Sequence, residues 1–140
     1  MSKTVLEVEY NYNFYLLGLV SPIKDYRLCW ALNKGCEMDF VKRSDLEINS
    51  KQHKKLVYFS IFEYIDEVDQ SQYNVITNKR NGEYLIPEMK EADYFFMIRG
   101  YAQDSDKTEL LKAIRSNPDI QAVFEVDPES LKSKQNLILE

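Results

Sequence analysis

The carboxylates Glu88 and Asp93 are the side chains whose type and spacing best suit acid–base chemistry. Glu88 follows a proline at the end of one expected strand, and Asp93 stands at the start of a strongly apolar one. Both are therefore expected near one end of a sheet, and paired carboxylates can divide the roles of acid and base. They can equally cap the turn at residues 89–92 or pair with a basic side chain, and we favour this structural role. The candidate basic partners are Arg27, Arg99 and Lys132.

Other catalytic and phosphate-binding patterns are missing from the sequence. The single histidine, His53, lies in a lysine-rich stretch, where the neighbouring cations disfavour its protonated form. We interpret it as a solvated loop residue rather than the base of a catalytic triad. There is also no GxGxxG and no GxxxxGK[ST] pattern, so no phosphate-binding loop is predicted.

Metal and disulfide chemistry are not expected either. Cys29 and Cys36 are seven residues apart, which on a helix separates them by about 10 Å, beyond the reach of a disulfide. No CxxC or HxxxH spacing exists, and we predict no metal and no cofactor. Four carboxylates could bind a hard cation, but they lack the spacing of an EF-hand and are interpreted as a solvated acidic turn. They are Glu63, Asp66, Glu67 and Asp69.

Length and charge restrict the class of protein. The chain has 140 residues, which suits one domain over 1–140. Its 18 basic and 23 acidic side chains give a net charge of −5, which makes nucleic acid an unlikely partner. A single-stranded platform built from the basic stretch 51–55 and the adjacent Tyr58 and Phe59 is disfavoured for the same reason. No apolar run is long enough for a signal peptide or a membrane span, so we expect a cytoplasmic protein without membrane contact.

The first half of the sequence predicts a strand, a helix and two more strands. Apolar patterns indicate one or two strands within 5–12 and 14–20. A helix follows, opened by Ser21-Pro22 or by Asp25 and closed near Gly35. Strands are expected at 40–48 and 56–65, separated by a polar loop and followed by the acidic turn.

The second half predicts a hairpin and a second strand–helix–strand unit. Asn81-Gly82 is a strong signal for a type I′ turn between strands 73–79 and 83–86. A strand at 93–101 leads to a helix that begins with the Asp106/Glu109 capping pair and ends near residue 117. A strand at 120–126, a helical turn at Asp127-Pro128 and a short edge strand at 137–139 complete the chain.

These elements predict an α+β fold. Residues 14–48 and 93–126 each form a strand–helix–strand unit, and two such units sharing a sheet resemble a ferredoxin-like two-layer sandwich. The sheet should be largely antiparallel, with the two main helices on one face. The other face, rich in Tyr and Phe, is expected to be half-exposed and available for dimerisation.

Three blocks of sequence resemble a known family. The stretch Ile86-Pro87-Glu88-Met89-Lys90-Glu91-Ala92-Asp93-Tyr94 is similar to the pattern of the IPExxxVDY family of uncharacterised bacterial proteins, with Ala92 in place of Val. Residues 25–28 (DYRL) and 131–137 (LKSKQNL) also look like members of that family. The resemblance implies one whole domain and no particular activity.

The leading hypothesis is a non-enzymatic interaction module that binds a protein partner or forms a homodimer through the aromatic sheet face. The alternative is a small-molecule sensor, since residues 94–126 look like the strand–helix–strand of ACT-type regulatory domains. It predicts a concave site between the end of the sheet and the helix after Gly100. A third hypothesis is an enzyme that uses Glu88 and Asp93. The candidate interaction or ligand residues are Tyr26, Arg27, Glu88, Asp93, Arg99 and Gly100.

Overall fold

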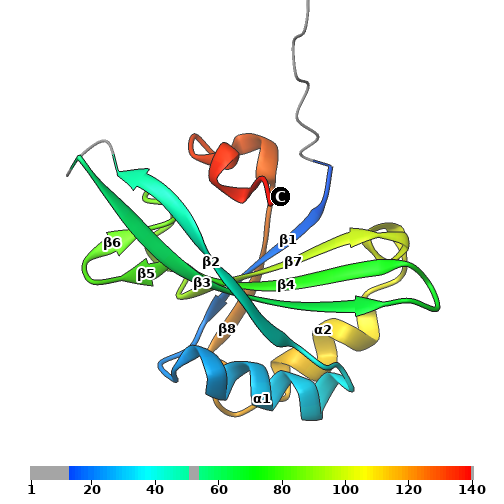
Figure 1. Ribbon diagram of the computed structural model, residues 1–140. Helices are drawn as coiled ribbons and strands as arrows, with labels where there is room; N and C mark the ends of the chain where they lie inside the picture. Colours follow the sequence, from blue (N-terminus) through cyan, green and yellow to red (C-terminus); the bar gives the residue numbers. More distant parts are fainter. Residues whose placement is uncertain (1–12, 51–53, 140) are drawn as a thin grey trace, which may run out of the picture.

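A six-stranded sheet carries two helices on one face and irregular chain on the other (Figure 1). The computed structural model describes residues 13–50 and 54–139. Its helices and strands are β1 (Tyr15–Val20), α1 (Asp25–Cys36), β2 (Val41–Ser50), β3 (Lys55–Asp66), β4 (Ser71–Thr77), β5 (Lys79–Arg80), β6 (Glu83–Tyr84), β7 (Tyr94–Gly100), α2 (Thr108–Arg115) and β8 (Ala122–Val126). Three short 3₁₀ turns follow β7 or β8: η1 (Tyr101–Asp104), η2 (Pro128–Ser130) and η3 (Lys134–Leu137).

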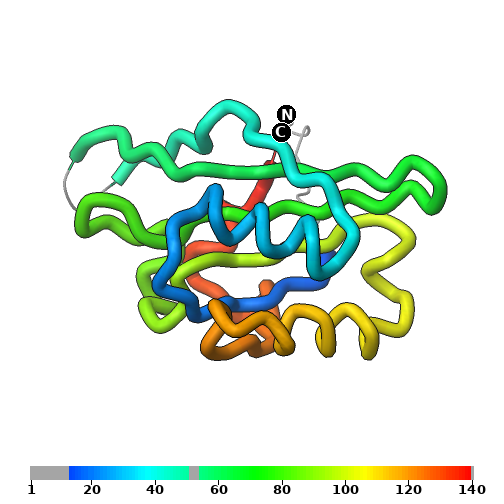
Figure 2. The backbone as a smooth tube through the Cα atoms, turned by 90° about the horizontal axis from the view of Figure 1, so that it is seen from below, coloured from blue at the N-terminus to red at the C-terminus, as the bar shows by residue number. Residues whose placement is uncertain are grey.

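The sheet has the order β2-β3-β4-β7-β1-β8, and every neighbouring pair is antiparallel. Helix α1 crosses from β1 to the far edge strand β2, and α2 crosses from β7 to the other edge strand β8. Figure 2 shows both helices on the same side of the sheet. The predicted α+β class is therefore confirmed. A ferredoxin-like sandwich is not, because β3 and β4 widen the sheet beyond the four strands of that fold.

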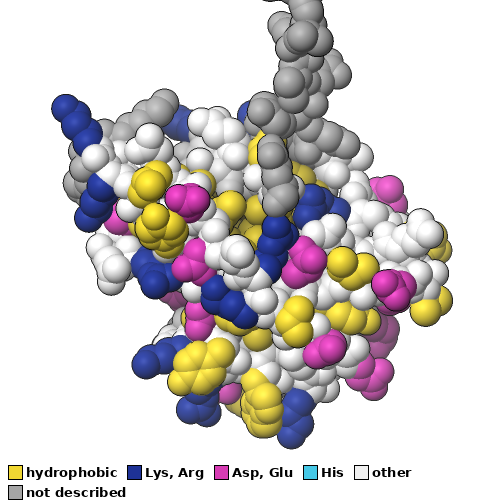
Figure 3. Space-filling view, viewed as in Figure 1, with side chains coloured by type: hydrophobic (Ala, Val, Ile, Leu, Met, Phe, Trp, Pro, Cys, Tyr) yellow, Lys and Arg dark blue, Asp and Glu magenta, His cyan; other side chains and the backbone are white. Residues whose placement is uncertain are grey.

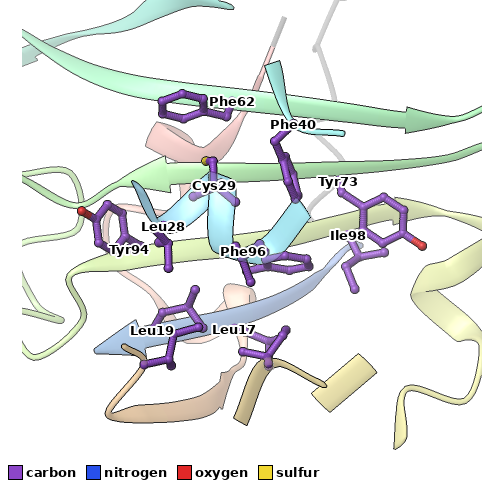
Figure 4. Close-up of a cluster of buried hydrophobic side chains, with 14 of the residues drawn as sticks. Leu17, Leu19, Leu28, Cys29, Phe40, Phe62, Tyr73, Tyr94, Phe96 and Ile98 are labelled. Atoms are coloured by element: carbon purple, nitrogen blue, oxygen red, sulfur yellow. The ribbon is translucent and has the colours of Figure 1, made fainter. Parts of the chain in front are cut away.

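The first core lies between the helices and the sheet (Figure 4). Helix α1 contributes Leu28, Cys29 and Leu32, which share one side of the helix because their spacing follows its 3.6-residue period. Phe40 and Tyr73 pack edge-on against Phe96, with ring centroids 5.9 and 6.2 Å away. Ile114 of α2 belongs to the same cluster, so both helices pack on one face of the sheet, as predicted.

The opposite face of the sheet is covered by the chain itself. Phe59 and Phe95, which point to this side, are 1% and 0% exposed. The stretch after β6 and the C-terminal segment (residues 127–139) supply their cover, including Ile86, Leu131 and Leu137. The expectation of a half-exposed aromatic face is corrected here, because a second apolar layer already packs on it.

The predicted turn at Asn81-Gly82 is confirmed, but the strand expected at 73–79 is not continuous: β4 ends at Thr77 and pairs with β7, whereas β5 pairs with β6. Asn81 and Gly82 have φ values of 51° and 81°, as a type I′ turn requires, and join β5 to β6. The resulting two-stranded hairpin is separate from the main sheet. The expected Asp106/Glu109 capping pair does not form, because Lys107 is the N-cap residue of α2. Asp106 instead accepts hydrogen bonds from the backbone N–H and the hydroxyl of Thr108, the first residue of the helix.

Other boundaries differ from the prediction. Helix α1 continues through Gly35, and Glu37 takes the left-handed conformation (φ 54°) that ends it. The Ser21 hydroxyl donates to the Asp119 carbonyl at 2.5 Å instead of capping α1. The expected strand at 137–139 is wrong, since Leu137 ends the 3₁₀ turn η3 and residues 138–139 have no regular secondary structure. The expected strand within 5–12 lies outside the described residues.

Candidate functional site

Glu88 holds the C-terminal segment. Its carboxylate accepts hydrogen bonds from the Ser133 backbone N–H at 2.7 Å and from the Ser133 hydroxyl at 3.0 Å. Burial alone would raise the pKa of Glu88, but these hydrogen bonds outweigh it and hold the pKa below its ordinary value. Ser133 immediately precedes η3, so Glu88 caps that turn from 45 residues away in the sequence.

Asp93 joins three parts of the chain at the start of β7. Its carboxylate accepts a hydrogen bond from the Ser21 backbone N–H at 2.8 Å and forms an ion pair with Lys79, also at 2.8 Å. The hydrogen bond to Asp93 raises the pKa of Lys79 above its ordinary value. Glu88 and Asp93 therefore have separate structural partners. Of the basic residues considered from sequence, Lys132 contributes to Glu88 through its backbone hydrogen bond, and neither carboxylate forms an ion pair with Arg27, Arg99 or Lys132 among the described residues. This contradicts the hypothesis of a catalytic carboxylate pair.

Arg99 and Gly100 lie at the far end of β7, about 20 Å from Asp93 along the strand. Arg99 Nη2 is 3.4 Å from the Asn74 side-chain oxygen, and Arg99 Nε is buried without a hydrogen-bond partner among the described residues. Gly100 has a φ of 96°, and a Cβ there would lie 2.4 Å from the Gln70 carbonyl oxygen. This glycine permits a close backbone approach, and of the other predicted site residues it adjoins Arg99.

Tyr26 and Arg27 are exposed on the outer side of α1, away from the carboxylates. The six residues predicted from sequence therefore do not form one site. They divide into a helix surface (Tyr26 and Arg27), two structural carboxylates (Glu88 and Asp93) and the end of β7 (Arg99 and Gly100).

The outer side of α1 carries an aromatic and basic stripe, which we call the α1 stripe: Tyr26, Arg27, Trp30 and Lys34. Residues 26, 30 and 34 follow one another at intervals of four, so their side chains share one face of the helix. Tyr26 is 61% exposed and Trp30 63% exposed, although large aromatic side chains are usually well buried. Lys34 Nζ is 4.7 Å from the Trp30 ring centroid, a cation–π distance that holds the two side chains together.

The charge of the α1 stripe is opposite to that of the whole chain. Arg27 and Lys34 give it two positive charges and it contains no carboxylate, whereas the chain has a net charge of −5. Neither cation forms an ion pair within residues 13–50 and 54–139. In the space-filling view, hydrophobic side chains stand beside Lys and Arg side chains over α1 (Figure 3). The stripe is thus a positively charged, aromatic surface that α1 does not use for folding.

Sequence reasoning placed Tyr26 and Arg27 in the candidate site but left out Trp30 and Lys34. The helical spacing could have identified them. Leu28, Cys29 and Leu32 share the side of the helix that faces the core, so positions 26, 30 and 34 lie on the opposite side.

The thiols and carboxylates of the described chain offer no redox or metal centre. Cys29 and Cys36 are unpaired, and burial raises the pKa of Cys36 to about 11, which makes its thiol a poor nucleophile. Within the residues that the structure describes, no cluster of His, Cys, Asp and Glu is suited to a metal ion. No helix in that part of the chain has the length and apolar character needed to cross a membrane.

Three hollows of ligand size lie on the described part of the molecule. A shallow one of about 670 Å³ is lined by Val68, Asp69, Gln70, Gly100 and Tyr101. The other two lie on opposite faces of the sheet. One, of about 460 Å³, lies between the end of α1, the start of α2 and the sheet, where Tyr73 and Ile98 line it. The other, of about 520 Å³, lies between the β2–β3 hairpin, β6 and the C-terminal segment. Both fall in the size range of small-molecule sites.

No family model, curated protein or solved structure matches this chain.

Proposed function

We propose that the protein is a non-enzymatic interaction module that binds an acidic protein partner through the α1 stripe. The observation that carries the proposal is the pair Tyr26 and Trp30, one helical turn apart and more than 60% exposed. Tyr, Trp and Arg are the residue types most enriched at the energetic centres of protein interfaces. Arg27 and Lys34 beside them favour a partner that offers carboxylates around an apolar anchor.

The same charges bear on self-association. In a symmetric dimer through α1, the stripe of one copy would face the stripe of the other, which brings Arg27 and Lys34 of one copy near the same two cations of the other. Repulsion between these cations disfavours that arrangement, and the aromatic sheet face is already covered. A homodimer therefore stays a prediction from sequence, and we favour a different, acidic partner.

Selection of random peptides displayed on phage tests the chemistry of the partner. The wild-type protein should enrich peptides that combine Asp or Glu with a large apolar residue. These peptides should lose most of their binding to the Tyr26→Ala/Trp30→Ala double variant. Tyr101→Ala serves as the control, because Tyr101 is 70% exposed but lies outside α1. Peptides without acidic enrichment, or with equal binding to the double variant, would contradict the proposal.

A second candidate function is small-molecule sensing. It is favoured by the hollow of about 460 Å³, which lies beside the end of the sheet and the start of α2, as the ACT-like hypothesis expects. A thermal-shift screen with amino acids and nucleotides tests it. Stabilisation that is lost in Ala113→Leu, a substitution that would fill this hollow, supports sensing; the absence of any shift counts against it.

Membership of the IPExxxVDY family and a cytoplasmic location are part of the proposal. The first is supported by the motif residues alone. The second is supported by the unpaired state of Cys29 and Cys36, since reducing compartments keep thiols free.

A further inference from the structure

We propose that the hollow between the β2–β3 hairpin and the C-terminal segment binds an amphipathic organic carboxylate, meaning an apolar body that ends in a carboxylate group. Three separate parts of the chain form this groove: the two long strands, β6 with the stretch that follows it, and residues 132–136. Its volume of about 520 Å³ suits a small molecule. The site is distinct from the α1 stripe, which lies on the other side of the sheet.

The floor of the groove is apolar. Val57 and Phe59 of β3 line it, and Ile48 of β2 lies beside them. Phe59 is 1% and Val57 7% exposed, so both are fixed by packing in the second core and form a firm surface. The hydrocarbon surface that an apolar ligand body would remove from water belongs to half-buried Ile48 and Tyr84 and exposed Pro87, which also line the groove, and covering it favours binding.

The rim of the groove is basic. Lys90 and Lys132 line it, and within the described ranges neither forms an ion pair. Lys90 Nζ lies 5.5 Å from the ring centroid of Tyr84, a third lining residue. This contact holds the ammonium group at the groove rather than in open water.

The carboxylates near the groove have other partners. Glu88 is bound to Ser133, and this contact fixes the backbone beside Lys132. Glu83, which lines the groove, lies 3.4 Å from the Ser50 hydroxyl. Two lysines against one lining glutamate leave an excess of positive charge above an apolar floor. This combination suits a ligand with one negative end and one apolar end.

Binding of three naphthalene probes with the same apolar body tests the proposal. They are 1-naphthoate, the neutral 1-naphthalenemethanol and the cationic 1-naphthylmethylamine, each titrated into ¹⁵N-labelled full-length protein and followed by amide chemical shifts. We expect saturable shifts around Val57, Lys90 and Lys132 with 1-naphthoate, weaker binding of the alcohol and the weakest binding of the amine. Lys90→Met and Lys132→Met should each weaken naphthoate binding about tenfold.

Two controls separate this site from other surfaces. Lys112→Met removes an exposed lysine of α2 and should leave naphthoate binding unchanged. Trp30→Ala tests whether the probe binds the α1 stripe instead, and it should also have no effect. Equal binding of carboxylate and amine, shifts centred on α1, or no saturation at the solubility limit of the probe would each overturn the proposal. None of these results depends on whether α1 binds a protein.

Discussion

At the scale of single residues, one buried asparagine organises the whole connection between β4 and β7. Asn78 is 0% exposed, and its side chain accepts from the Ile86 N–H at 2.8 Å. It also donates to the carbonyl oxygens of Met89 at 3.0 Å and Ala92 at 2.8 Å. Residues 85–93 form no helix or strand, and Asn78 provides hydrogen-bond partners for three of their backbone groups, as buried polar groups require.

Asn78→Ala should therefore be strongly destabilising. It removes the side-chain partner of the Ile86 N–H and of the Ala92 carbonyl, whereas the Met89 carbonyl keeps the hydrogen bond from the Ala92 N–H, and we expect a loss of about 3 kcal/mol in the free energy of unfolding. Urea denaturation measures this loss. Asn117→Ala, which removes a hydrogen bond in an exposed turn, is the matched control and should cost less than about 1 kcal/mol. Equal effects of the two substitutions would show that Asn78 does not hold this connection.

The contact between Glu88 and Ser133 should make stability depend on pH. Because the folded-state pKa of Glu88 is lowered, its stabilising contribution is present above the ordinary glutamate pKa of about 4.3 and is lost as the pH falls through the folded-state value. Glu88→Gln should be less stable than wild type at neutral pH, and the difference should shrink under acidic conditions. Urea midpoints measured from neutral to acidic pH test this, with the exposed Glu91→Gln as control. A difference that does not change with pH would contradict the assignment.

At the scale of elements, a glycine in β1 makes room for a neighbouring aromatic ring. Gly18 pairs with Phe124 of β8 across the edge of the sheet. A Cβ at residue 18 would lie 2.5 Å from the Phe124 ring, well inside contact distance. The ring therefore lies over the glycine, and the last strand of the sheet depends on this fit.

Gly18→Ala should cost about 1–3 kcal/mol through overpacking. Part of this loss should be recovered in Gly18→Ala/Phe124→Leu, because the smaller side chain leaves space for the new methyl group. A double-mutant cycle on unfolding free energies measures the coupling. Strictly additive effects would mean that the ring does not contact residue 18.

The C-terminal segment covers the second core, although it consists of the 3₁₀ turns η2 and η3 and irregular chain. Leu137 is 2% exposed and packs in this core, so Leu137→Ala should cost about 2–5 kcal/mol. It should also increase the binding of a hydrophobic dye by exposing the sheet. Leu56→Ala, at a leucine that is 52% exposed, should change stability by less than about 1 kcal/mol. Calorimetry and dye fluorescence test both; equal losses would contradict the assigned cover.

At the scale of the whole molecule, the parts that sequence could predict are those fixed by local chemistry. The Asn81-Gly82 hairpin follows from two residues that tolerate positive φ. Helix α1 follows from the spacing of Leu28, Cys29 and Leu32. Strand β7 follows from an uninterrupted apolar run, as expected for a strand buried on both faces.

The parts that sequence could not predict depend on contacts between distant segments. Residues 127–139 have no strong periodicity, so nothing local shows that Leu131 and Leu137 cover the sheet. The link from Glu88 to Ser133 spans 45 residues, and either side chain would look the same at a solvated turn. For the same reason Glu88 and Asp93 could be interpreted as catalytic from sequence, although the structure gives both of them structural partners.

Both faces of the sheet are thus occupied, by the helices on one side and by the chain's own irregular segments on the other. The exposed aromatic surface left for a protein partner on the helix layer is the α1 stripe. This division predicts that changes to Tyr26, Arg27, Trp30 and Lys34 leave the fold intact, because none of these side chains belongs to either core.

Photo-crosslinking in the native cell tests the central claim most directly. A benzophenone amino acid is placed at position 30 in the α1 stripe and, as control, at position 101, an equally exposed aromatic site elsewhere. We predict a discrete adduct with an acidic protein from position 30 only, lost when Arg27→Glu and Lys34→Glu reverse the charge of the stripe. Adducts of equal yield from both positions, or an adduct at position 30 that survives the charge reversal, would contradict the account.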